Sequence, residues 1–207
     1  MTAPQRVLLV HGLLNADWWL LPLAAQLRRQ GFTPLHFDYP SVRGGPGQAI
    51  PQLAQRLREG DVDAVVGHSL GGLVALEALR QAPGAGVRRV VCIGSPLCGS
   101  ATARRVQARR WTRPLLGRSA GLLTAGLARW DGQAELGVVA GDVPRGLGRL
   151  FSQFDCPSDG TVGVEETRLP GCADHCVVHA SHTGLVFSPE AARQAANFLQ
   201  HGRFRPA

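Results

Sequence analysis

The chain has 207 residues, of which 44% are hydrophobic and 18% charged, a composition typical of a soluble globular protein with a sizeable core. The net charge is +7, and every basic residue other than histidine is an arginine. No apolar run is long enough to span a bilayer, and the residues before the first apolar run lack the basic and long apolar regions of a signal peptide. We therefore expect one domain over residues 1–207, located in the cytoplasm.

The first half of the chain alternates short apolar runs with amphipathic stretches, which is the pattern of βαβ units on a parallel sheet. The expected strands are Val7–Val10, Phe32–Asp38, Asp63–Val66 and Arg89–Ile93. Helical periodicity lies between them, through residues 18–29, 49–59 and 73–81, with Asn15 and Asp17 as candidate caps of the first helix. The Gly-Gly-Pro-Gly sequence at 44–47 is expected to be a loop. Right-handed crossovers then place the carboxyl ends of these strands at one edge, where parallel sheets bind ligands.

Residues 99–133, here called the roof segment, interrupt this pattern. They are basic and apolar, rich in Gly and Ala, and lack the alternation of a strand. We expect one or two short helices here, which form a lid or roof over the ligand site.

The roof segment lies within a strongly basic stretch. Between Glu77 and Asp131 the chain has ten arginines and no acidic residue. Six of them fall within residues 104–118: Arg104, Arg105, Arg109, Arg110, Arg113 and Arg118. Such a face suits an anionic lipid surface or an acyl carrier protein, and the alternative is an ordinary solvated surface. Trp111 is the only aromatic residue among these arginines, so we expect no nucleic-acid partner.

Beyond the roof segment, strands and helices return. Leu136–Ala140 and Cys176–Ala180 are expected strands, with a turn-rich loop over Asp155–Gly163 between them. A closing helix spans Pro189–Gln200, with Ser188 as its N-cap. The sequence thus predicts an α/β protein with a mostly parallel central sheet flanked by helices.

The strongest motif is Gly67-His-Ser-Leu-Gly71, a G-x-S-x-G sequence between a predicted strand and a predicted helix. The chain must reverse sharply there while it lifts one hydroxyl above the edge of the sheet, and the two glycines permit the close approach of the backbone. The alternative is a structural turn with a surface serine. The strand before the motif and the helix after it favour Ser69 as a nucleophile.

A serine hydroxyl needs a general base within hydrogen-bonding reach, and the chain has seven histidines. His182 follows the last predicted strand and precedes the final helix, which places it at the carboxyl edge of the sheet. His179 is the second candidate. His68 adjoins the serine, but we expect its side chain to point elsewhere.

The base in turn needs a carboxylate that orients the imidazole and stabilises its protonated form. Asp159, in the loop before the last predicted strand, gives the chain order serine, aspartate, histidine. Asp155 is the nearest competitor, and Asp142 becomes the choice if the strand count is shifted.

An oxyanion that develops during acyl transfer needs backbone N–H donors, each contributing on the order of 3 kcal/mol. Leu70 follows the nucleophile at the predicted helix start and supplies one donor. Gly12 allows a tight turn after the first strand, which directs the amide of Leu13 towards the same point. An ordinary strand-ending turn is the alternative explanation of this glycine.

Four segments together resemble the landmarks of the α/β-hydrolase superfamily, most nearly the small bacterial lipases and esterases. They are Val10-His-Gly12, Gly67-His-Ser-Leu-Gly-Gly72, Ser158-Asp-Gly160 and Ser181-His-Thr-Gly184. The resemblance implies an α/β-hydrolase fold with a small helical roof and, given the short chain, no large cap domain. It also implies a triad of Ser69, Asp159 and His182, with Leu13 and Leu70 as oxyanion donors.

Members of this superfamily cleave carboxylic esters without a cofactor, so we expect an esterase or lipase acting on a small-molecule or lipid ester. A thioesterase or acyltransferase acting on carrier-bound acyl groups uses the same triad and is the alternative, and a non-catalytic binding module is the third hypothesis. Leu14 and Trp18 are the expected substrate-binding residues. For each of them, packing in the core is the alternative role.

The five cysteines are scattered and odd in number, which favours free thiols. Cys172 and Cys176 lie close to His175 and His179, but the paired knuckles of a zinc site are missing. We therefore expect no metal.

Overall fold

The described residues of the computed structural model, 5–145 and 156–205, form a six-stranded sheet in the order β2-β1-β3-β4-β5-β6. Every neighbouring pair of strands is parallel. The strands are β1 (Arg6–Val10), β2 (Thr33–Phe37), β3 (Ala64–His68), β4 (Arg89–Ile93), β5 (Glu135–Gly141) and β6 (Asp174–Val178). The central strands are continuous apolar runs because helices cover both of their faces.

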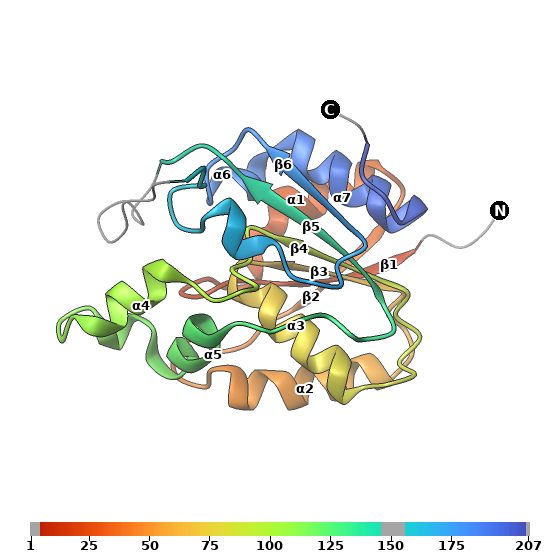
Figure 1. Cartoon of the computed structure of the whole chain (residues 1–207). Coiled ribbons are helices and arrows are strands. Elements are labelled where there is room, and N and C mark those ends of the chain that lie inside the picture. Colours follow the sequence, from red (N-terminus) through yellow and green to blue (C-terminus); the bar gives the residue numbers. More distant parts are fainter. Residues whose placement is uncertain (1–4, 146–155, 206–207) are drawn as a thin grey trace.

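Two helical layers enclose the sheet (Figure 1). One contains α1 (Leu21–Arg29), α6 (Gly184–Phe187) and α7 (Pro189–His201), which pack on a core that includes Leu9, Val66 and Val91. The other contains α2 (Pro46–Arg58) and α3 (Leu70–Gln81), which pack on Leu8, Val65 and Val90. Adjacent residues of one strand thus serve opposite layers, as the pleat of a sheet requires.

The roof segment forms α4 (Ala101–Ala108), the short 3-10 turns η2 (Arg113–Leu115) and η3 (Gly117–Ser119), and α5 (Ala120–Ala125). It lies on the side of the molecule where the strands end (Figure 1). Glu166 ties it down, because one carboxylate oxygen accepts the Ala101 N–H at 2.6 Å and the other accepts the Gly163 N–H at 3.0 Å. The expected short helices are therefore present, without a large cap among the described residues.

Several predicted boundaries are wrong. The last strand is Asp174–Val178 rather than Cys176–Ala180, because pairing with β5 begins where Gly137 lies opposite Asp174. Helix α2 begins at Pro46, since proline is favoured in the first turn of a helix. Neither Asn15 nor Asp17 caps α1, which follows directly on the 3-10 turn η1 (Asp17–Leu20).

Of the helices in the described part of the chain, none is both long and apolar enough to cross a membrane.

Candidate active site

Ser69 occupies a strained turn between β3 and α3. Its backbone angles are φ 56° and ψ −124°, a positive-φ conformation that costs a non-glycine residue about 1–3 kcal/mol. Strand β3 ends at His68 and α3 begins at Leu70, so the reversal is confined to the serine. The Ser69 N–H donates to the Ile93 carbonyl of β4 at 2.9 Å, which fixes the turn to the sheet.

The two glycines of the motif are required by space. A Cβ at Gly67 would lie 2.6 Å from the Gly72 Cα, and one at Gly71 would lie 2.6 Å from the His11 carbonyl oxygen and clash with that of Val10. The helix therefore starts directly against the backbone of β3 and β1.

The His182 imidazole joins the side chains of Ser69 and Asp159. Its Nδ1 lies 2.7 Å from Asp159 Oδ2, and its Nε2 lies 3.1 Å from Ser69 Oγ. A carboxylate only accepts hydrogen bonds, so Nδ1 donates to Asp159 and neutral Nε2 is free to accept the serine proton. The structure thus brings the predicted nucleophile, base and acid together in that order.

Asp159 is held by its own loop. Its side chain is 1% exposed, and Oδ1 accepts the N–H groups of Thr161 at 2.9 Å and Val162 at 2.7 Å. Its backbone carbonyl also accepts the His182 N–H at 2.9 Å. One residue therefore orders both the turn on which it sits and the segment that carries the histidine.

Two opposing effects act on the pKa of His182. Burial of the ring lowers it, but the charge of Asp159 and the hydrogen bond to that carboxylate outweigh burial and raise the pKa above 6.5. The raised pKa means that Asp159 stabilises the imidazolium that forms when His182 receives the serine proton.

His68, which the sequence analysis did not place in the site, contacts His182 through a hydrogen bond and its ring. Its Nε2 donates to the His182 carbonyl at 3.2 Å, and the two ring centroids are 4.9 Å apart. Burial, followed by the neighbouring His182, lowers the pKa of His68 to about 3, so this ring is neutral. The contact depends on how the last loop folds over β3, and no local sequence signal indicates it.

The loop after β1 and the start of α3 present the two predicted donor amides. No described residue accepts a hydrogen bond from the N–H of Leu13 or of Leu70. His11 Nδ1 donates to the Gly12 carbonyl at 2.9 Å, and the Leu14 N–H donates to Ser41 Oγ at 3.2 Å. These bonds hold the peptide between Gly12 and Leu13 and leave its N–H available.

The competing residues of the sequence prediction lie apart from Ser69. His179 Nδ1 pairs with Asp142 Oδ1 at 2.9 Å, and the His179 side chain is 87% exposed. Asp155 lies outside the described residues. His179 and Asp142 therefore form a pair of their own, away from the nucleophile.

A cavity of about 400 Å³ opens beside Ser69 and His182. Leu14 lines it, as predicted, whereas its aromatic wall is Trp19 and not Trp18. The roof segment supplies much of the remaining apolar wall: Ala103, Val106, Leu115, Leu116 and Leu123. Such a lining suits an apolar chain, and Ser69 lines the same cavity.

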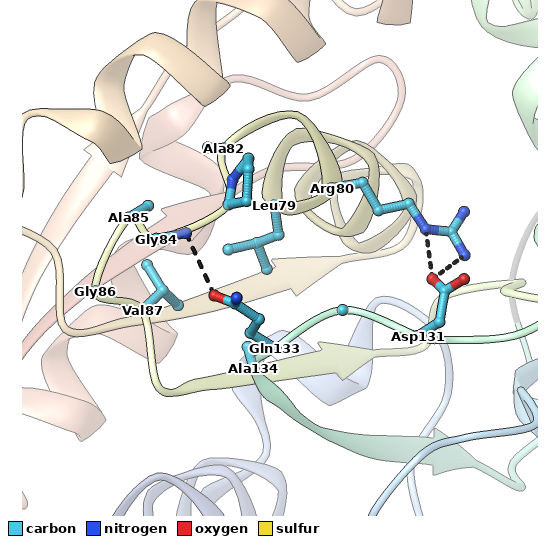
Figure 2. Close-up of a pocket in the computed structure, with 12 residues that line it drawn as sticks. Leu79, Arg80, Ala82, Gly84, Ala85, Gly86, Val87, Asp131, Gln133 and Ala134 are labelled. Carbon is cyan, nitrogen blue, oxygen red and sulfur yellow. Dashed lines mark hydrogen bonds and ion pairs between the residues drawn. The ribbon is translucent and has the colours of Figure 1, made fainter.

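A second hollow, of about 290 Å³, lies at the other end of α3 (Figure 2). Its charged groups satisfy each other, since Arg80 pairs with Asp131 at 3.0 Å. The Gln133 side chain accepts the Gly84 N–H at 3.3 Å. The residues that line this second hollow include no serine, cysteine or histidine that could act on a substrate.

The candidate zinc ligands are engaged elsewhere or dispersed. His175 Nε2 lies 2.8 Å from Thr167 Oγ1, and His179 pairs with Asp142. Within residues 5–145 and 156–205 there is no group of three or more side chains that could hold a metal ion.

Comparisons with solved structures show proteins of the same fold. The mature form of Bacillus licheniformis lipase BlEst2 has a similar structure, with a TM-score of 0.76 and 20% identity, covering 97% of this chain and 92% of that one. A lipase-esterase related protein from Clostridium acetobutylicum gives a TM-score of 0.66 at 12% identity, covering 96% and 94%. The surfactin thioesterase domain SrfTE gives 0.57 at 13%, covering 96% and 91%.

No curated protein matches the sequence. The sequence model of the alpha/beta hydrolase family matches residues 7–203. That span includes β1 from its second residue onward, strands β2 to β6, the strained serine turn and the segment that bears His182. The chain belongs to the alpha/beta hydrolase family.

Proposed function

We propose that the protein is a serine hydrolase that cleaves carboxylic esters through a Ser69–His182–Asp159 triad. The observation that carries the proposal is the imidazole of His182, which lies within hydrogen-bonding distance of both Ser69 Oγ and Asp159 Oδ2 beside an apolar cavity. A turn with only a structural role would not require strain at Ser69. It would also not require a histidine hydrogen-bonded both to the serine hydroxyl and to a carboxylate.

The first half of the reaction forms an acyl-enzyme. Ser69 Oγ bonds to the acyl carbon while His182 Nε2 takes its proton, and the carbonyl oxygen becomes an oxyanion that receives the N–H groups of Leu13 and Leu70. The ester C–O bond then breaks, and the leaving alcohol takes the proton from His182. Asp159 stabilises the imidazolium throughout.

The second half regenerates the serine. Water attacks the acyl carbon, gives a proton to His182 Nε2, and the Ser69 oxygen leaves with that proton. The reaction needs one water per ester and no cofactor.

A thioesterase or acyltransferase acting on carrier-bound acyl groups is the second candidate function. The basic roof segment beside the cavity favours it, because acyl carriers are acidic, and SrfTE, with a similar fold, is a thioesterase domain. The chemistry at Ser69 is the same with a thiol as the leaving group.

Turnover of short and long p-nitrophenyl esters beside the matching acyl thioesters tests both candidates. We expect faster turnover of the esters and labelling of Ser69 by a fluorophosphonate. The substitution His182→Ala should abolish labelling, whereas His179→Ala, the matched control, should leave it intact. Absence of both turnover and labelling in the wild type would disprove the hydrolase, and faster thioester turnover would favour the second candidate.

A further inference from the structure

The mouth of the cavity is rimmed by exposed apolar side chains from separate segments. Leu14, in the loop after β1, is 62% exposed, and Leu115, in the roof segment, is 45% exposed. Both also line the cavity. Large apolar side chains that stay in water at a cavity mouth are typical of a surface that meets an apolar partner.

The apolar rim continues beyond the cavity on one side through an aromatic row. Trp19, in the cavity wall, has its ring 5.9 Å from that of Trp18 and 6.0 Å from that of Phe187. Trp18 is 62% exposed and Phe187 50%. Two elements distant in sequence, η1 and α6, thus present aromatic surface beside the same opening.

The roof segment, which supplies part of the cavity wall, also carries an exposed tryptophan. Trp111 is 92% exposed and lies between α4 and η2. The loop that carries it is held from within, since Thr112 Oγ1 donates to the Val106 carbonyl at 2.8 Å and the Leu115 N–H donates to the Thr112 carbonyl at 3.0 Å. An exposed indole on such a held loop is suited to the interface between a membrane and water.

Positive charge surrounds this tryptophan. Arg110 precedes it and Arg113 follows it, both exposed, in a stretch from residue 78 to 130 that contains no acidic residue. An apolar rim with arginines at its Trp111 end matches a lipid surface that is apolar within and anionic at its headgroups. An acidic carrier protein would satisfy the arginines but would not require exposed apolar side chains such as Leu14 and Leu115 at the opening.

We propose that this rim, consisting of Leu14, Trp18, Trp111, Leu115, Phe187 and the flanking arginines, docks the protein on an anionic membrane with the cavity facing the lipid. The inference rests on the proposed function for one part only, that the docked cavity takes its acyl ester from that surface. Docking itself requires no catalysis and is tested apart from it.

The test measures binding of the full-length Ser69→Ala variant to phosphatidylcholine vesicles with and without phosphatidylglycerol. We expect binding to the anionic vesicles that weakens as salt is added. Replacing Arg110 and Arg113 with glutamine should weaken it by about 25-fold, on the basis of about fivefold per arginine near an anionic surface. Trp111→Ser should also weaken it, by removing the inserted indole.

The matched control is Arg28→Gln with Arg29→Gln. These exposed arginines end α1, which runs back from the site to the opposite edge of the sheet, and their loss removes the same charge. The control should bind vesicles like the parent. Equal weakening in both double variants would mean that only net charge matters and would overturn the inference, as would equal binding to neutral and anionic vesicles or none to either.

Two further readouts separate the alternatives. Binding of an acidic acyl carrier protein that is lost with Arg110 and Arg113, without vesicle binding, would replace the membrane by a carrier. The wild type and the variant with Arg110→Gln and Arg113→Gln should hydrolyse a short, water-soluble ester at equal rates, because neither arginine lines the cavity. If the wild type does not hydrolyse that ester, the proposed function is refuted. Vesicle binding by the Ser69→Ala variant still decides the docking proposal.

Discussion

At the scale of single residues, the site depends on an imidazole that must be neutral before reaction and stable as a cation during it. Asp159 serves the second requirement by raising the pKa of His182 above 6.5, against the effect of burial. His68, whose ring neighbours that of His182, carries no charge at neutral pH because its pKa lies near 3. The neutral neighbour contributes a hydrogen bond without adding a second positive charge.

The raised pKa sets the pH dependence. Below its pKa His182 is protonated and cannot accept the serine proton, so kcat/KM for a soluble ester should fall as the pH drops, with a midpoint above 6.5. Asp159→Asn removes the charge that raises the pKa, so the midpoint should move to lower pH while the rate falls by about 10⁴-fold. A pH–rate profile of both proteins measures this, and an unmoved midpoint would contradict the assignment.

At the scale of elements, the site depends on how closely α3 begins against β1. The helix has no room for a side chain at Gly71, where a Cβ would meet the carbonyl oxygens of Val10 and His11. Because the loop after β1 follows directly, any shift of α3 also changes the separation of the two donor amides.

Gly71→Ala should therefore lower the free energy of unfolding by about 1–3 kcal/mol, the usual cost of overpacking. Gly47→Ala is the matched control, since Gly47 is an exposed helical glycine with open space around it. It should raise the free energy of unfolding, by up to about 1 kcal/mol. Urea denaturation followed by circular dichroism compares the two, and similar effects from both would refute the steric argument.

The same scale shows what the sequence could predict. Strands β1, β3 and β4 are recognisable because burial on both faces makes them continuous apolar runs. Strand β6 lies at the edge of the sheet, and its Asp174 and His175 conceal its start, so its predicted bounds fall two residues too late in the chain. The chain order of Ser69, Asp159 and His182 could be predicted from motifs. The choice of Trp19 over Trp18 could not, because it depends on which way a 3-10 turn directs adjacent side chains.

At the scale of the whole molecule, part of the stability comes from the end of the sheet that is remote from the site. Phe198 of α7 is fully buried against Gly137, in the half of β5 that is remote from the site. Its ring also lies 5.0 Å from that of Phe204. Phe198 thus joins the last helix to the sheet, and it does not line the cavity.

Phe198→Ala should accordingly lower the free energy of unfolding by about 3–5 kcal/mol. Phe198→Leu, which keeps most of the volume, should cost less. In the folded fraction of either variant, the rate of fluorophosphonate labelling at Ser69 should match the wild type. Slower labelling at a temperature where the variant is folded would show that the two ends are coupled.

The bonds made by Asp159 have an evolutionary consequence. A descendant that abandoned hydrolysis could replace Ser69 and relieve the strain of its turn, or replace His182 and leave the sheet intact. Replacement of Asp159 by a residue without a side-chain acceptor would instead remove the hydrogen bonds to the N–H groups of Thr161 and Val162, which order the loop. Among relatives that have lost activity, the aspartate should therefore persist longest, and its presence alone is a poor marker of an active enzyme.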